Sequence, residues 1–158
     1  MEKKNHKILV VDDDKAILKL ITVILQKYDY IMYPFDDPLK ALNQVKEVNP
    51  DIILLDLMMP NMSGFQLANK IREMEEFNFT PIALITAHYK GIQNIVKGFE
   101  LGANDFIQKP FDAQELVVRV RSLSRMKELY DQVKFQNKLI KKVEQASLTA
   151  LAKLAEFR

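Results

Sequence analysis

The amino-acid sequence predicts an α/β fold in which a doubly wound, five-stranded parallel sheet is followed by an extended C-terminal helix or coiled coil. Short apolar runs alternate five times with segments whose apolar residues recur every three or four positions. Uninterrupted apolar runs suit strands that helices bury on both faces, and the longer period indicates those helices. No Gly or Pro follows Pro110 in this chain of 158 residues, which favours a long final helix.

The predicted strands are five apolar runs at residues 8–11, 30–33, 52–55, 81–85 and 106–107. Asp37-Pro38 and Ser63-Gly64 mark the starts of the second and third helices between these strands. Because crossovers between parallel strands are right-handed, all strand C-termini should meet at one edge of the sheet. The four helical stripes consist of Ile17, Leu20, Ile21, Ile24 and Leu25; of Ala41, Leu42, Val45 and Val48; of Leu67, Ala68, Ile71 and Met74; and of Ile92, Ile95, Val96 and Phe99.

The segment after Pro110 divides into a part that covers the sheet and a part that extends beyond it. Leu116, Val117 and Val120 give residues 112–125 an apolar face for the sheet. We therefore predict a domain over residues 1–125 and a helical linker or coiled coil over residues 126–158. An a/d seam with alternating spacings of 3 and 4 consists of Leu123, Met126, Tyr130, Val133, Asn137 and Ile140.

Two features of this linker leave its partner open. Asn137 occupies an a position, where a polar side chain fixes the pairing register. The e positions hold Lys127, Lys134 and Lys141 without acidic residues at g, so a wider helical bundle is an alternative to a dimer. The seam slips at Glu144, which allows either one continuous helix or two nearly collinear ones. The stripe beyond the slip consists of Leu148, Leu151, Leu154 and Ala155.

Composition excludes several classes of function. The 23 basic and 21 acidic side chains give a net charge of +2, which argues against a general polyanion binder. The absence of Cys excludes disulfides and thiolate metal sites, and His6 and His88 are poor candidates for metal ligands, with His6 expected to be solvated. No apolar run approaches the roughly 20 residues of a membrane span, so we expect a cytoplasmic protein. The basic tail lacks a helix-turn-helix pattern, and no direct contact with nucleic acid is expected.

Reactive polar residues follow the predicted strands. Asp12 and Asp13 come after the first strand, Asp56 after the third, Thr86 after the fourth and Lys109 after the fifth. Taken singly, these residues are typical of helix caps, turns and loops. Together they should converge on the carboxyl edge of the sheet, where ligands bind in this architecture.

This set of residue types indicates phosphoryl chemistry. Clustered carboxylates repel one another, and an all-oxygen set without His or Cys favours Mg²⁺. Two carboxylates would hold the metal while a third attacks phosphorus. Thr86 is suited to donate a hydrogen bond to one phosphoryl oxygen, and Lys109 to neutralise another.

Five motifs, carried by four segments, resemble the receiver domain of two-component response regulators over about residues 5–125. The four segments are, in this order, ILVVDDD, DIILLDLMMPNMSGFQL, PIALITAH and LGANDFIQKPF. The resemblance implies a flavodoxin-like sheet with strand order 2-1-3-4-5. It also implies that Asp56 accepts a phosphoryl group from a sensor histidine kinase.

The resemblance assigns the remaining roles residue by residue. It implies that Mg²⁺ is held by Asp13, by Asp56 and by the backbone carbonyl of Met58, with Asp12 acting directly or through water. Lys109 matches the lysine of the family.

The same resemblance implies a switch. Thr86 and Phe106 correspond to the hydroxyl and the aromatic residue that respond to phosphate. The response would repack the face formed by the fourth and fifth strands and the helices after them. A homodimer formed through this face or through the C-terminal helix is expected.

The final residues suggest an output, and we expect the chain to belong to a longer parent because it stops inside an apolar helix. VEQASLTALAKLAEFR resembles the lead-in to an HD-GYP cyclic di-GMP phosphodiesterase domain, with a diguanylate cyclase or a hybrid kinase as rival parents. The alternative enzyme class is a haloacid dehalogenase-type Mg²⁺-dependent phosphatase with Asp12 as nucleophile and Asp14 as acid. Ala16 stands where that family has Thr, which places it far below the receiver.

Overall fold

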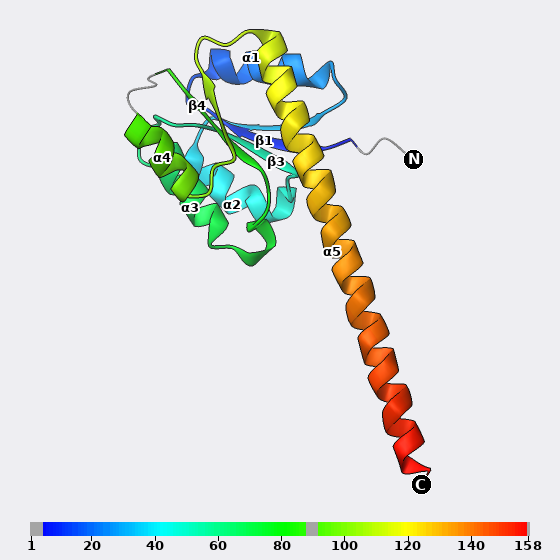
Figure 1. Ribbon diagram of the computed structural model, residues 1–158. Coiled ribbons are helices and arrows are strands. Elements are labelled where there is room, and N and C mark those ends of the chain that lie inside the picture. The colour runs from blue at the N-terminus through cyan, green and yellow to red at the C-terminus, as the bar shows by residue number, and fades with distance from the viewer. Residues whose placement is uncertain (1–4, 88–91, 158) are drawn as a thin grey trace. The chain divides into compact units, whose positions relative to one another are not determined.

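Five parallel strands form one sheet in the computed structural model, which describes residues 5–87 and 92–157 (Figure 1). The strand order is β2-β1-β3-β4-β5, as the resemblance implies, so the predicted fold class and strand order are confirmed. The strands are β1 (Lys7–Val11), β2 (Ile31–Phe35), β3 (Ile52–Asp56), β4 (Ile82–Thr86) and β5 (Asp105–Gln108). The helices are α1 (Lys15–Gln26), α2 (Pro38–Val48), α3 (Gly64–Arg72), the 3₁₀ helix η1 (Glu75–Phe77), α4 (Ile92–Glu100) and α5 (Ala113–Glu156).

Helices cover both faces of the sheet. One apolar cluster joins the sheet to α2 and α3, and the other joins its opposite face to α1 and the first turns of α5. Every residue of β3 and β4 is buried, as the continuous apolar runs predict. Strand β2 lies at the edge of the sheet and is only partly buried. A proline such as Pro34 is tolerated in an edge strand because one side of that strand has no neighbouring strand to pair with.

Local signals in the sequence begin three of the helices. The Asp14 carboxylate accepts hydrogen bonds from the backbone N–H groups of the first turn of α1, and Asp37 does the same for α2. Ser63 and Gln66 form a capping box at the start of α3. Helix α3 ends at Arg72, so the prediction that Met74 continues its apolar stripe was wrong, and Met74 instead precedes η1.

The Arg72 side chain, at the end of α3, connects the loops that precede β4 and β5. Its guanidinium donates to the carbonyl oxygens of Phe77, Thr80 and Gly102 at 2.6–3.1 Å, and to Oδ1 of Asn104 at 2.9 Å. One side chain thereby ties the loops that enter β4 and β5 at the edge of the sheet opposite the strand C-termini.

The chain divides into two compact units, Met1–Lys127 and Glu128–Arg158. In the first unit Leu116, Val117 and Val120 are buried against the sheet, as predicted. Leu123 is also buried in this core, so the prediction that it begins the a/d seam was wrong. The second unit is the remainder of α5, a single helix rather than two. Within the described ranges no helix is both long and apolar enough to cross a membrane.

Candidate functional site

The ends of four strands bring the polar residues to one edge of the sheet. Parallel pairing sets Asp56 beside Ile85 and Thr86 beside Gln108, so β3, β4 and β5 end close together. Asp12 directly follows β1, and Lys109 directly follows β5. The backbone N–H of Lys109 donates to the Thr86 carbonyl oxygen at 2.8 Å.

Three carboxylates form a cluster at this edge. Asp12, Asp13 and Asp56 each offer one oxygen, and these three atoms lie within 4.8 Å of one another. Asp12 and Asp56 are buried, whereas Asp13 is exposed. Three carboxylate oxygens, one of them open to solvent, fit a hard divalent cation such as Mg²⁺, which keeps several water ligands.

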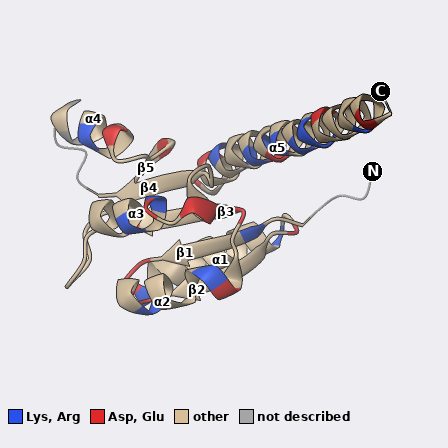
Figure 2. Cartoon of the chain, turned by 90° about the horizontal axis from the view of Figure 1, so that it is seen from below, with Lys and Arg blue, Asp and Glu red and all other residues tan. Residues whose placement is uncertain are grey.

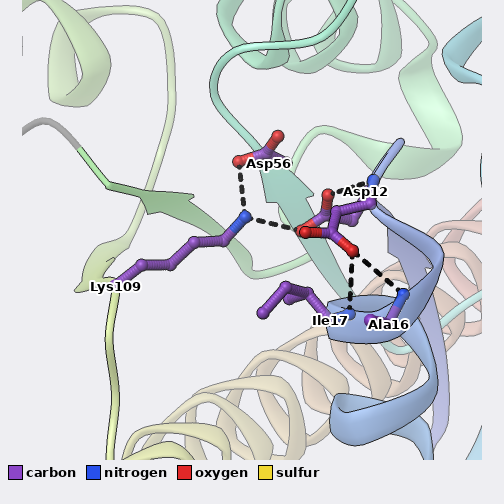
Figure 3. A network of polar contacts seen from close by, with 6 residues as sticks. Asp12, Ala16, Ile17, Asp56 and Lys109 are labelled. Atoms are coloured by element: carbon purple, nitrogen blue, oxygen red, sulfur yellow. Dashed lines mark hydrogen bonds and ion pairs between the residues drawn. The ribbon is translucent and has the colours of Figure 1, made fainter.

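Lys109 lies against the two buried acids (Figure 3). Its Nζ is 2.8 Å from Oδ2 of Asp12 and 3.2 Å from Oδ1 of Asp56. Burial lowers the pKa of Lys109, but the hydrogen bond and charge of Asp12, together with those of Asp56, more than offset this and raise the pKa. Lys109 is therefore protonated at neutral pH, and its positive charge pairs with both carboxylates.

The surroundings of Asp56 shift its acidity. Burial first, and then the negative charge of Asp12, raise its pKa to about 6, and Lys109 only partly opposes this shift. The protein thus maintains a carboxylate whose ionised form is disfavoured by its surroundings. A bound cation would relieve that cost.

This acidity predicts how stability depends on pH in the metal-free protein. The pKa of Asp56 is about 6 when folded and 3.8 in its ordinary state, so the folded chain holds more protons between these values. The free energy of unfolding should therefore fall as pH rises from 4 to 7, by up to about 3 kcal/mol. Urea unfolding in EDTA at several pH values measures this change, with Asp56→Asn as the control that should lack it. Equal pH profiles for both proteins would contradict the prediction.

Two other predicted residues, Thr86 and Met58, lie at or near this edge. Thr86 is buried at the end of β4. Met58 follows Asp56 by two residues and its side chain is 66 % exposed, so only its backbone is suited to a role within the site. The Lys109-Pro110 peptide bond is cis.

Phe106 is buried on β5 and packs against α4. Its ring meets that of Phe99 edge-on, with the centroids 5.2 Å apart. It also abuts Gly98, where a Cβ would overlap the tip of the Phe106 ring and lie 3.0 Å from Cε1 of Phe65. The absence of a side chain at residue 98 is therefore what allows the ring to be buried there.

We expect Gly98→Ala to destabilise the protein by about 1–3 kcal/mol through this overlap. Urea unfolding should show a much smaller cost for the same substitution in a Phe106→Leu background, because the shorter side chain leaves room for the methyl group. If the two substitutions are additive, the contact does not determine the position of the ring.

Some features were missed in the sequence. His6 is only 5 % exposed, so the expectation that it is solvated was wrong; its carbonyl oxygen accepts from Ile31 N–H and extends the strand pairing. His88 lies outside the described residues. Gly64 lies against the Asp56 backbone, where a Cβ would overlap the Asp56 carbonyl oxygen, and this contact was also missed. A residue with poor helix propensity directly after the Ser63 cap was a usable signal.

Comparisons with known proteins agree on one family. Residues 8–121 match the response regulator receiver domain. The chain is 42% identical over 127 residues to the transcriptional regulatory protein ResD of Bacillus subtilis, covering 79% of this chain and 51% of ResD. It is 37% identical over 119 residues to the DNA-binding dual master transcriptional regulator RpaA of Synechocystis sp., covering 75% and 49%.

Solved structures give the same result. The chemotaxis response regulator CheY4 of Vibrio cholerae superposes with a TM-score of 0.72 at 28% identity, covering 76% of this chain and 99% of CheY4. The chain spans about half the length of the curated relatives named above.

Proposed function

Because the chain belongs to the receiver domain family of two-component response regulators, we propose that it is switched by phosphorylation of Asp56. The observation that carries this proposal is the position of the Asp56 carboxylate. It ends a fully buried strand, lies in a cluster with Asp12 and Asp13, and is contacted by the Lys109 ammonium. We infer that residues 1–125 form the receiver and residues 126–158 the linker.

The donor in this family is the phosphohistidine of a sensor kinase. An Asp56 carboxylate oxygen attacks phosphorus, the bond between phosphorus and the histidine nitrogen breaks, and the imidazole leaves with the electron pair of that bond. The product is an acyl phosphate on Asp56. Lys109, already 3.2 Å from Asp56 Oδ1, is placed to neutralise a phosphoryl oxygen, and the Thr86 hydroxyl is assigned to another.

Magnesium is the implied cofactor, and the donor set fits it. Asp13, Asp56 and the Met58 backbone carbonyl would hold the ion, with Asp12 contacting it directly or through water. When bound, Mg²⁺ neutralises charge between the carboxylate nucleophile and the anionic donor. Asp12 also orients Lys109 through the 2.8 Å contact.

The experiment that tests this function is phosphorylation by a small donor. Incubation with acetyl phosphate and Mg²⁺ should add one phosphoryl group, about 80 Da by intact mass spectrometry. The label should be lost in hydroxylamine, as expected for an acyl phosphate, and should not form in EDTA. A mass that stays unchanged at saturating donor and Mg²⁺ would reject the proposal.

Asp14 bears on the phosphatase alternative, which uses Asp12 as nucleophile and Asp14 as acid. The Asp14 carboxylate accepts from the backbone N–H groups of Ala16 at 2.9 Å and Ile17 at 3.3 Å, and so caps α1. This engagement favours Asp56 as the phosphate acceptor over Asp12.

We propose that the linker carries the signal to an output through a homodimer. Size-exclusion chromatography with light scattering should show a change in mass or shape when beryllofluoride and Mg²⁺ are added. No change in either quantity would count against switching by dimerisation.

The proposed output rests on the resemblance of residues 143–158 to the lead-in of an HD-GYP cyclic di-GMP phosphodiesterase. RpaA is named as a DNA-binding regulator and ResD as a transcriptional one, which makes a DNA-binding output the competing proposal. The coding sequence downstream of residue 158 in the source genome distinguishes them. An HD pair followed by GYP supports the phosphodiesterase, whereas a GGDEF or helix-turn-helix segment rejects it.

A further inference from the structure

Two overlapping heptad seams run along α5 beyond the receiver. Both seams contain the same residue at every seventh position. In one seam the second residue of each heptad lies four places after the shared residue, and in the other seam it lies three places after it. The shared positions are Met126, Val133, Ile140, Ser147 and Leu154. The first seam, here called the polar seam, adds Tyr130, Asn137, Glu144 and Leu151. The second, the apolar seam, adds Leu129, Gln136, Val143, Ala150 and Phe157.

The apolar side chains of these seams are exposed. Leu129 is 62% exposed, Val133 53%, Ile140 55%, Val143 66% and Leu154 66%. Large apolar side chains repeated at this spacing along more than four turns are typical of a helix that buries them against another helix. Figure 2 shows basic and acidic residues interspersed along α5, so no single charge sign opposes pairing.

The first half of the segment favours the apolar seam. This seam places the β-branched Val133 and Ile140 at a positions and Leu129 at d, the combination that favours a parallel two-stranded coiled coil. It also moves Lys134 and Lys141 to outer positions. The polar seam instead sets these two lysines at flanking e positions without acidic partners.

The second half balances this preference. There the polar seam gains Leu151 in place of Ala150, and within the first half the Asn137 pair specifies the register of the polar seam. Its cost is Glu144, which takes the place that Val143 has in the apolar seam. Because a helical residue turns by about 100°, the centres of the two seams differ by only about 50° around the helix.

A second set of contacts connects α5 with the switch. Arg119 of α5 donates to both carboxylate oxygens of Asp105 on β5, at 2.9 and 3.1 Å. Asp105 directly precedes Phe106, and its Oδ1 also accepts from the Phe106 backbone N–H at 2.8 Å. Helix α5 continues without interruption from this contact to Glu156.

We propose that a second copy of this chain pairs in parallel along residues 126–157 in either of two registers, and that phosphorylation of Asp56 changes their populations. The apolar seam is the register of the unphosphorylated dimer. This inference rests on the proposed function, because it takes Asp56 as the phosphate acceptor and the linker as a dimer contact.

The natural absence of Cys allows a direct test by disulfide cross-linking of full-length single-Cys variants. Val133→Cys lies in both seams and should cross-link in either register, so it reports dimerisation alone. Gln136→Cys reports the apolar seam and Asn137→Cys the polar seam. Without phosphate the Gln136→Cys variant should cross-link faster than Asn137→Cys. Beryllofluoride with Mg²⁺ should change the ratio of these rates by about fivefold or more, and Asp56→Asn should remove that response.

The outcomes separate the parts of the proposal. If Val133→Cys does not cross-link, the parallel dimer is wrong and the two registers are rejected with it. If Val133→Cys cross-links while the ratio of Gln136→Cys to Asn137→Cys is the same with and without beryllofluoride, the dimer stands and the register change is rejected. Leu129→Cys and Tyr130→Cys repeat the comparison one heptad earlier, and opposite preferences at the two levels would also reject a common register.

Because none of these exposed positions belongs to the phosphorylation site, each variant should still take up one phosphoryl group from acetyl phosphate. That measurement tests the proposed function separately. Labelled variants with an unchanged cross-linking ratio would reject only the register change, whereas unlabelled wild-type protein would reject the proposed function itself.

Discussion

Asp56→Asn will abolish incorporation of a phosphoryl group from acetyl phosphate, whereas Asp12→Asn will only slow it. The amide at residue 56 is not a competent nucleophile, and Asp56 is the buried carboxylate that ends β3 and contacts Lys109. Asp12 orients Lys109 and supports the cation, so its loss should lower the rate by about 10- to 100-fold. Intact mass spectrometry over a time course measures both.

The same two variants also distinguish a receiver from a haloacid dehalogenase-type phosphatase. Far-UV circular dichroism and urea unfolding confirm that each variant is folded. A label that survives Asp56→Asn and disappears only with Asp12→Asn would reject the receiver mechanism and favour the phosphatase. Asp14→Asn is the matched control, because it changes a neighbouring acid that caps α1 and should leave labelling nearly unchanged.

Gly64→Ala will destabilise the protein by about 3 kcal/mol, near the upper end of overpacking effects. A Cβ at this position would overlap the Asp56 carbonyl oxygen and lie 3.0 Å from Cα of Leu57, and backbone atoms cannot rotate away from it. The backbone N–H of Gly64 also donates to the Leu57 carbonyl oxygen at 2.9 Å, which fixes the close approach. Urea unfolding at pH 7 measures the loss.

The neighbouring substitution Ser63→Ala provides the control. It removes the capping hydrogen bond to Gln66 N–H without adding atoms, and should cost about 1 kcal/mol. If Gly64→Ala costs no more than Ser63→Ala, the backbone yields at this point and the close approach does not constrain Asp56.

The sheet and its polar edge were predictable because local sequence specifies them. Buried strands such as β3 and β4 are apolar along almost their whole length, and the end of each is therefore visible in the sequence as a polar last residue, Asp56 or Thr86. Parallel connections then place these ends together without any knowledge of long-range contacts. The cluster of Asp12, Asp13 and Asp56 follows from that topology.

The missed features depend on contacts between distant segments. Nothing near Arg72 in the sequence indicates that it binds the carbonyl of Gly102, and nothing near Gly98 indicates that the Phe106 ring lies against it. Leu123 satisfies a heptad pattern and a core position equally well, and only packing against α1 and the sheet decides between them. Periodicity shows which face of a helix is apolar, but not which surface covers it.

The uninterrupted course of α5 has a consequence for how receivers of this kind can be recombined with other domains. Each residue of an α-helix turns by about 100°, so a change in the length of the helix also rotates the side chains that follow the change. Adding or removing seven residues after Lys127 leaves the later side chains within about 20° of their original direction around the helix axis, whereas three or four residues rotate both seams together by about 40–60°. We therefore expect chimaeras to be functional when their linker lengths differ by multiples of seven residues. A linker that differs by three or four residues should instead alter the output permanently, whether or not Asp56 is phosphorylated.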